Sequence, residues 1–117
     1  MLQMYGIKNC DTVKKARSFC EKQAIDYQFH DFKKTPPTKL QIETWLKQID
    51  WQTLLNMRGM TWRRLAESEK ENINKTRAIK LMLANPSIIK RPVVEVKHRV
   101  LVGFDAKTYQ QYADKND

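Results

Sequence analysis

The chain of 117 residues is poor in cysteine and glycine and has no long apolar stretch. No apolar run approaches membrane-spanning length, and the N-terminus lacks the apolar stretch and cleavage site of a signal peptide. We therefore expect a soluble, cytoplasmic protein that does not associate with membranes. Two cysteines in an otherwise ordinary composition exclude a disulfide-rich scaffold.

Two classes of site are also absent from the sequence. There is no glycine-rich phosphate loop, and no cluster of cysteine and histidine has metal-ligand spacing. His30 lies in an expected strand and His98 in an expected turn, so we favour a structural or solvent-facing role for both. We expect neither a bound cofactor nor a metal ion.

The charge is strongly positive, because 22 Lys and Arg residues against 13 Asp and Glu residues give a formal net charge of +9. The basic residues are scattered along the chain in runs no longer than two, with acidic residues among them. This distribution is typical of a solvated basic surface. Nucleic-acid binding remains the alternative, although no recognition motif accompanies the charge.

Changes in apolar periodicity indicate an α/β fold. Alternating segments predict strands at 2–5, 27–32, 92–96 and 100–102, and helical patterns follow residue 10, residue 38 and residue 105. Residues 51–85 have the pattern of several short helices. Capping boxes are expected at Thr38 with Gln41, in front of the preceding helix, and at Ser68 with Glu71 within this region. The helix after Thr38 should end near Asp50. This order predicts a sheet of parallel and antiparallel strands flanked by helices.

Cys10 lies where the first strand gives way to the first helix. The first N–H groups of a helix lack partners within it, and the helix dipole places positive charge there. A cysteine at this position favours its thiolate form, and nearby lysines add to the effect. The alternative is that Cys10 is a small buried hydrophobe. Cys20 shares a face with Val13 and Ala16, which predicts core packing, and a separation of about 15 Å from Cys10 along one helix is too long for a disulfide.

Two arginines next to turn residues are further candidates. Arg91 precedes Pro92 at the start of a strand, and it would offer a forked donor to an oxyanion or carboxylate if it points toward Cys10. An ordinary surface arginine at a strand end is the competing interpretation. Arg58, just before Gly59, has the same two interpretations.

Several motifs together resemble those of the arsenate reductase-like family, in particular its YffB-type branch near the Spx regulators. They are YGIKNCDTVKKAR at 5–17, LNMRG at 55–59, WRRL at 62–65, IIKRPVV at 88–94 and VGF at 102–104. The resemblance covers nearly the whole chain. It implies one ArsC-like domain, 1–117, with a thioredoxin-like core at about 1–50 and 86–117 and a helical insertion at about 51–85.

The resemblance also assigns roles to residues. It implies that Cys10 is the catalytic nucleophile, that Arg91 binds an oxyanion and that Pro92 is the cis-proline beside the thiol. Arg58 falls near another arginine of the family site, and we add Lys8 as an anion-binding candidate. Asn9 joins Pro92 as a structural residue of the site.

Two positions depart from the family patterns. Gly103 replaces the third arginine of the arsenate reductase site, which argues against efficient arsenate reduction. Val13 stands where Spx regulators have the second cysteine of a Cys-x-x-Cys switch, so a switch of that type is excluded.

Two functions therefore compete. The first is a monomeric reductase in which Cys10 attacks a disulfide or an oxidised anionic substrate and glutathione, as co-substrate, resolves the adduct. The second is an Spx-like module that binds the RNA polymerase α subunit without catalysis, because fold alone does not decide function.

Overall fold

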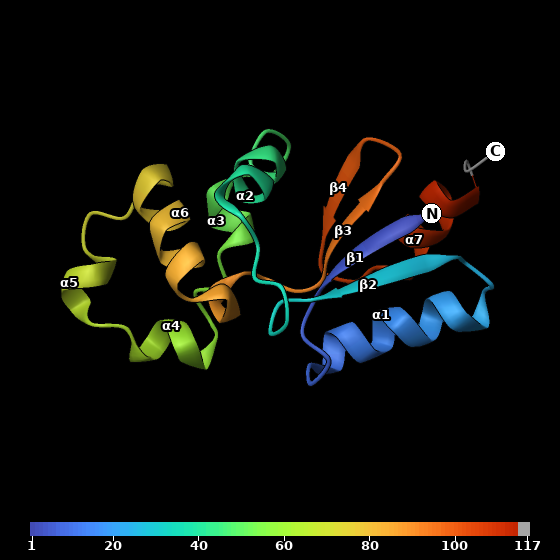
Figure 1. Ribbon diagram of the computed structural model, residues 1–117, viewed down its shortest axis with the longest axis horizontal. Helices are drawn as coiled ribbons and strands as arrows, with labels where there is room; N and C mark the ends of the chain where they lie inside the picture. Colours follow the sequence, from blue (N-terminus) through green and yellow to red (C-terminus); the bar gives the residue numbers. More distant parts are fainter. Residues whose placement is uncertain (115–117) are drawn as a thin grey trace. The chain divides into compact units, whose positions relative to one another are not determined.

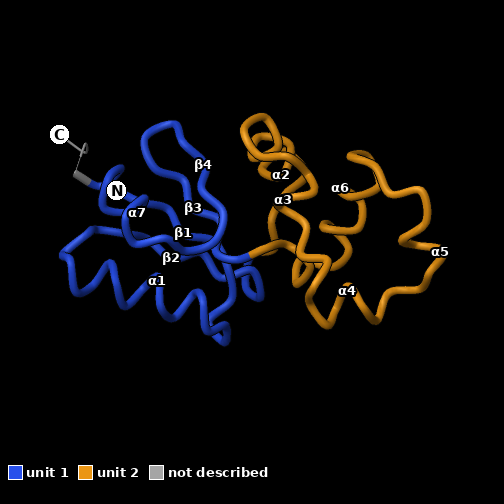
Figure 2. Tube along the Cα trace, turned by 180° about the vertical axis from the view of Figure 1, so that it is seen from behind, with its two compact units in different colours: residues 1–35, 91–117 blue, residues 36–90 orange. Residues whose placement is uncertain are grey.

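The computed structural model describes residues 1–114, which divide into two compact units (Figure 2). The first unit joins Met1–Thr35 to the chain from Arg91 onward, and the second is Pro36–Lys90. The helix that follows Thr38 therefore groups with the later helices rather than with the sheet. The expected domain organisation, with a core boundary near residue 50, stays a prediction about the whole chain.

The first unit is built on a four-stranded mixed sheet (Figure 1). Its elements are β1 (Leu2–Gly6), α1 (Asp11–Lys22), β2 (Tyr27–Asp31), β3 (Val93–Val96), β4 (Arg99–Val102) and α7 (Ala106–Asp114). The strand order is β2-β1-β3-β4, with β1 parallel to β2 and antiparallel to β3, and β3 antiparallel to β4. The predicted fold class, a mixed sheet flanked by helices, is confirmed.

One face of this sheet carries the apolar core. Alternation along β1 puts Leu2 and Met4 on the buried face, as expected for a strand with a period of two. Ala16 and Cys20 from α1 and Tyr109 from α7 pack in the same cluster. Both helices therefore contribute to a single core, and α1 is fixed in place at the end of β1.

The hairpin between β3 and β4 turns at Lys97 and His98, which have φ values of 49° and 66°. Two consecutive residues with positive φ match the twist of the strands that they join. The turn expected at 97–99 is thus one residue shorter, because Arg99 already belongs to β4.

The second unit is helical. It contains α2 (Lys39–Trp45), α3 (Trp51–Leu54), α4 (Met60–Arg64), α5 (Glu67–Lys70), α6 (Lys75–Ala84) and the 3₁₀ helix η1 (Pro86–Ile88). The capping box of α2 is confirmed, since the Gln41 N–H donates to Thr38 Oγ1 at 3.1 Å and the Thr38 N–H donates to Gln41 Oε1 at 2.9 Å. The expected end of this helix near Asp50 is wrong. After Trp45 the regular helical pattern is interrupted, because Lys47 and Gln48 donate to carbonyls three residues back, and only Ile49 again donates to a carbonyl four residues back.

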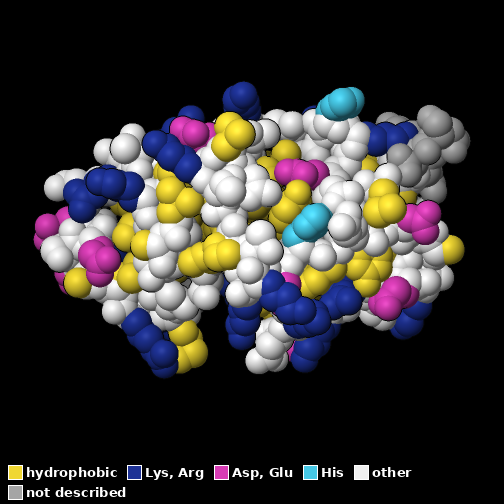
Figure 3. All heavy atoms as spheres, in the orientation of Figure 1, with side chains coloured by type: hydrophobic (Ala, Val, Ile, Leu, Met, Phe, Trp, Pro, Cys, Tyr) yellow, Lys and Arg dark blue, Asp and Glu magenta, His cyan; other side chains and the backbone are white. Residues whose placement is uncertain are grey.

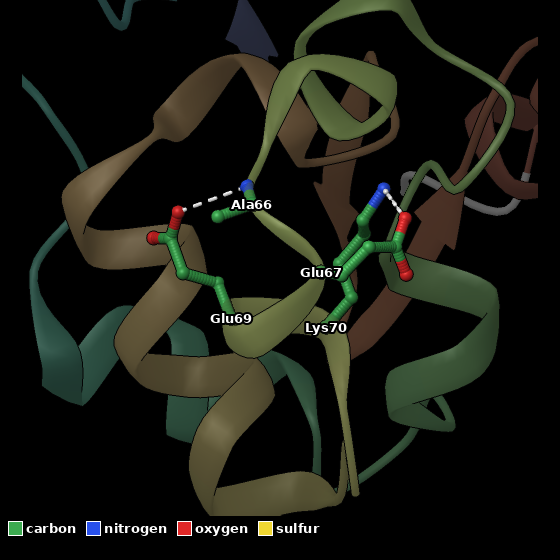
Figure 4. Close-up of polar contacts among 4 residues, drawn as sticks. All are labelled: Ala66, Glu67, Glu69 and Lys70. Atoms are coloured by element: carbon green, nitrogen blue, oxygen red, sulfur yellow. Dashed lines mark hydrogen bonds and ion pairs between the residues drawn. The ribbon is translucent and has the colours of Figure 1, made fainter.

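The capping box expected at Ser68 and Glu71 is also wrong, because Ser68 already lies inside α5. The N-cap is Ala66, two residues earlier than expected, and its N–H donates to Glu69 Oε1 at 3.2 Å. Lys70 Nζ lies 3.3 Å from Glu67 Oε1 on the same turn (Figure 4). A carboxylate three residues after the N-cap therefore decides where this helix starts.

Trp45 is the tryptophan that anchors the second unit, and it is fully buried. Trp51 and Trp62 are only half-buried. Lys70 Nζ lies 5.8 Å from the centre of the Trp62 ring, in a cation–π contact at the surface. Within the described residues, no helix is long and apolar enough to span a membrane.

Candidate functional site

Cys10 is the N-cap residue of α1. Its backbone is extended, with φ −147° and ψ 123°, and its carbonyl accepts the Lys14 N–H at 2.9 Å. The side chain makes no capping hydrogen bond and is partly exposed. The thiol therefore stands at the positive end of the helix dipole, within reach of solvent, as the change of periodicity predicted.

Cys20 occupies the core, as predicted. It is fully buried, and burial, assisted by the negative charge of Glu21, raises the pKa of its thiol to about 11. A thiol is nucleophilic only as the thiolate, so Cys20 is inert near neutral pH. The two cysteines therefore differ in role: the thiol of Cys10 is accessible, whereas Cys20 contributes only to packing of the core.

Gly6 joins three parts of the first unit at the end of β1. A Cβ atom at this position would lie 3.0 Å from Val13 Cγ2 and 3.7 Å from Arg91 Cβ. The strand end, the first turn of α1 and the backbone that carries Arg91 therefore pack together. Gly6 lies within the motif at 5–17, but the sequence alone did not indicate a role for it. A glycine at the end of a strand is a known signal of close approach between backbones.

Arg91 and Pro92 are joined by a cis peptide bond, the form that the resemblance implied. Arg91 is half-buried, and its Nε atom is buried. The Pro92 carbonyl accepts the N–H of Gly103 at 2.8 Å. Arg91 thus lies beside the strand end that leads into the Cys10 loop, while its binding of an anion stays a prediction.

Lys8 and Asn9 lie in the loop between β1 and α1, and both are exposed. They precede Cys10 directly in the sequence. Their roles in binding and in shaping the site stay predictions.

Arg58 belongs to the second unit. It is exposed, and its N–H donates to Asn56 Oδ1 at 3.3 Å. Backbone bonds from Asn56 to Ile88 and from Lys90 to Leu54, both 2.7 Å long, hold its loop against the end of the unit. A cavity of about 450 Å³ opens there, lined by Gln52, Thr53, Leu55, Asn56, Met57, Arg58 and Lys90. The membership of Arg58 in the Cys10 site stays a prediction.

Gly103 has a positive φ of 85°, and a Cβ atom built on it would meet no atom within 4 Å. Side chains other than glycine are strained in this conformation. The Tyr109 hydroxyl donates to the Gly103 carbonyl at 2.8 Å, and burial raises the pKa of this tyrosine. The hydrogen bond from Tyr109 to Gly103 depends on tertiary structure.

His30 is held in a network on the sheet face opposite the core. Its ring stacks on Tyr5 with centroids 4.5 Å apart, and His30 Nε2 lies 2.6 Å from Gln3 Oε1. The Tyr5 hydroxyl donates to Glu95 Oε1 at 3.0 Å. These contacts account for His30 structurally, while His98 is exposed in the hairpin turn. In residues 1–114, no group of three or more His, Cys, Asp and Glu side chains could hold a metal ion.

Basic side chains are spread over both units on the face drawn in Figure 3, with acidic side chains among them. The view matches the scattered distribution along the sequence. Nucleic-acid binding stays an untested alternative.

Comparison with known proteins places these features in a family. Residues 5–112 match the model of the ArsC family. The solved structure of the YffB (PA3664) protein is 42% identical with a TM-score of 0.93, over 97% of this chain and 99% of that one. An arsenate reductase (ArsC) related protein from Brucella melitensis is 45% identical with a TM-score of 0.76, over 95% of this chain and 92% of that one.

A more distant relative has a regulatory name. The global transcriptional regulator Spx of Streptococcus pyogenes is 21% identical over 118 residues, which cover 99% of this chain and 87% of the regulator. The predicted resemblance is confirmed, and on the match of residues 5–112 and the two similar solved structures, the chain belongs to the ArsC family.

Proposed function

We propose that this protein is a glutathione-linked thiol reductase in which Cys10 is the nucleophile. The observation that carries this proposal is the contrast between the two cysteines. Cys10 is partly exposed at the N-terminus of α1, whereas Cys20 is buried with a pKa of about 11. No second thiol of the chain can resolve an adduct on Cys10, so the resolving thiol comes from solution. Relatedness to an arsenate reductase related protein supports the reductase class.

The reaction begins when the Cys10 thiolate attacks one sulfur of a substrate disulfide. A bond forms between Cys10 Sγ and that sulfur, and the other half of the disulfide leaves as a thiolate. A glutathione thiolate then attacks the mixed disulfide and releases Cys10. When the substrate is a mixed disulfide with glutathione, the products are the substrate thiol and oxidised glutathione. One glutathione thiol from solution is consumed in each cycle, and the disulfide bond passes from the substrate to oxidised glutathione, so the number of disulfide bonds is conserved.

Cationic groups would hold the negative charges of glutathione or of an oxidised anionic substrate. Arg91 offers a planar fork of donors that suits a carboxylate, and Lys8 offers a mobile point charge beside the thiol. Arg58 would add a third cation. In this proposal Asn9 and Pro92 shape the loops on either side of the thiol. The reducing glutathione pool of the cytoplasm, the location we expect, would drive the cycle.

Arsenate is a poor candidate substrate. The family arginine that would complete the oxyanion site corresponds to Gly103, which carries no side chain. The positive φ of 85° at this position also strains any arginine placed there. We therefore propose disulfides as the substrate class.

The test is adduct formation followed by turnover. We expect the reduced protein to acquire one glutathione on exposure to oxidised glutathione, measured by intact mass and peptide mapping. Cys20→Ser should retain the adduct and Cys10→Ser should lose it. Turnover of hydroxyethyl disulfide, coupled to glutathione reductase and NADPH, should fall in Arg91→Ala and recover partly in Arg91→Lys. Absence of any adduct on Cys10 would refute the proposal.

Relatedness to Spx favours a second candidate, a regulatory module that binds the RNA polymerase α subunit. Val13 removes the second switch cysteine, so this version would not sense redox state through a Cys-x-x-Cys disulfide. Binding to purified α subunit, equal in wild type and Cys10→Ser, would support it. Turnover by Cys10 without such binding would favour the reductase.

A further inference from the structure

A groove on the first unit continues from the Cys10 end of α1. It has a volume of about 440 Å³ and is lined by Lys14, Lys15, Ser18, Phe19, Lys22 and Phe104. All but Phe104 come from α1, and Phe104 follows β4. We call this surface the Phe19–Phe104 groove.

The floor of the groove is aromatic and fixed from behind. The rings of Phe19 and Phe104 have centroids 5.5 Å apart and are tilted by 58°. Phe104 also meets Tyr109 edge to face, with centroids 5.1 Å apart, and Tyr109 is 1% exposed. Both phenylalanines are half-buried, so part of each side chain remains accessible while the core holds their positions. A large apolar side chain can therefore dock without prior rearrangement of the floor.

The rim of the groove is positively charged. Lys14, Lys15 and Lys22 are exposed, and Lys14, Ser18 and Lys22 follow one another at intervals of four residues along one line of α1. Within the part of the chain that the structure describes, none of these lysines forms an ion pair, and no carboxylate lines the groove. This combination of an apolar floor and a cationic rim complements an acidic segment that carries one large apolar side chain.

A protein segment fits this surface better than a nucleic acid. Stacking of bases requires an exposed ring face. Phe19 and Phe104 instead contact each other and Tyr109 at large interplanar angles, and both are half-buried, which leaves less ring surface for stacking. Partly accessible aromatic side chains of this kind suit an aliphatic or aromatic side chain from a peptide.

The groove shares its helix with the candidate nucleophile. Lys14 donates its N–H to the Cys10 carbonyl at 2.9 Å, so the groove starts one turn after the thiol. At 1.5 Å per residue, Lys14 and Lys22 lie about 6 and 18 Å along the helix from Cys10. An extended peptide covers these lengths in about two to five residues.

We propose that the substrates of Cys10 include proteins whose disulfide-bonded cysteine lies two to five residues from a large apolar side chain flanked by Asp or Glu. The apolar side chain occupies the Phe19–Phe104 groove, and the carboxylates meet its lysines. This inference rests on the proposed reductase function, because it names the substrate class of that reaction. The electrons come from glutathione, and the exchange steps are those given above.

The test uses synthetic peptides whose one cysteine carries glutathione. In the first, Phe lies three residues after the cysteine and is flanked by Asp and Glu. A second peptide replaces Phe with Ser, and a third replaces the acidic residues with Lys. We expect kcat/KM for the first peptide to exceed both others by about tenfold or more at low salt, with a smaller ratio at high salt.

Variants connect this preference to the groove. Lys15→Glu combined with Lys22→Glu should lower kcat/KM for the first peptide about tenfold, a larger factor than for hydroxyethyl disulfide. Lys75→Glu, which changes an exposed lysine of the second unit, should have no effect and serves as the matched control. Equal rates for all three peptides, or no effect of the double change, would overturn the proposal.

Binding separates failure of the docking surface from failure of the chemistry. With Cys10→Ser, fluorescence anisotropy of the labelled first peptide measures docking in the absence of exchange. Binding that Lys15→Glu with Lys22→Glu weakens would support the groove even if no peptide turns over, and only the reductase function would then fail. Equal binding of the Ser peptide, or tighter binding of a single-stranded oligonucleotide that displaces the first peptide, would contradict the docking proposal.

Discussion

Gly6→Ala should distort the junction that positions the candidate site. The added Cβ would lie 3.0 Å from Val13 Cγ2, whereas carbon atoms in optimal contact are about 3.5 to 4.0 Å apart. Val13 is fully buried, so it has little room to yield. Overpacking of this kind costs about 1 to 3 kcal/mol, and the entropic gain of replacing glycine returns about 0.4 to 1 kcal/mol. We expect a net loss of stability of about 1 to 2 kcal/mol.

The second change that tests this reasoning is Val13→Ala, which removes the methyl group that the new Cβ would meet. By itself it should cost about 2 kcal/mol, from two buried methyl groups and the space that they leave. In this background Gly6→Ala should no longer clash. Its effect should therefore reverse sign and stabilise the protein by about 0.4 to 1 kcal/mol, through the unfolded state.

Urea unfolding of the four proteins, followed by circular dichroism, gives the coupling energy. We expect a coupling of about 1 to 3 kcal/mol between positions 6 and 13. Val100→Ala, a buried change on β4, is the control, and its effect should add to that of Gly6→Ala. If Gly6→Ala has the same effect with Val13 and with Ala at position 13, the packing described at the end of β1 is wrong.

Three further predictions concern stability. Because burial raises the folded pKa of Cys20 from 9.0 to about 11, the unfolded thiol ionises first, and stability should be full below pH 9 and fall as pH rises toward 11. The loss in the free energy of unfolding should reach about 3 kcal/mol, measured by urea titrations at several pH values. If the free energy of unfolding of Cys20→Ala fell with pH as steeply as that of the wild type, another group would be responsible. Gly103→Ala should lower the unfolding free energy by about 1 to 2 kcal/mol, because the φ of residue 103 is positive. The added Cβ has open space around it, so backbone strain is the expected cause. Equal melting curves for variant and wild type would count against that strain. Asn74→Ala should cost about 1 kcal/mol by removing the side chain that caps α6 at Arg77 N, while Asn74→Ser should retain most of the stability; equal losses in both would argue against the cap.

Local patterns in the sequence were sufficient for most of the first unit. Alternation of apolar residues found β1 and β2, and the switch to a helical period after Cys10 located the candidate nucleophile. Thr38 and Gln41 cap their helix by bonding to each other's backbone, so four consecutive residues contain the complete capping motif. The mixed sheet followed from the order of such elements.

The features that sequence reasoning missed depend on contacts between distant residues. Arg91 reaches Gly6 only because β3 pairs with β1, and the bond from Tyr109 to Gly103 requires α7 to pack on the core. The start of α5 was missed for a different reason. Ser68 is a strong capping residue by type. However, the carboxylate of Glu69 accepts the N–H of Ala66, and the helix therefore starts after Ala66.

The strand order has a consequence for biosynthesis. β1 leaves the ribosome well before its partner β3, which begins only at Val93, after the whole second unit has been translated. Until then β1 can pair only with β2, and its other edge exposes backbone groups that a second chain could bind. The nascent protein is therefore most exposed to aggregation at the strand that leads to Cys10. This interval ends when Val93–Val96 emerges and closes the sheet.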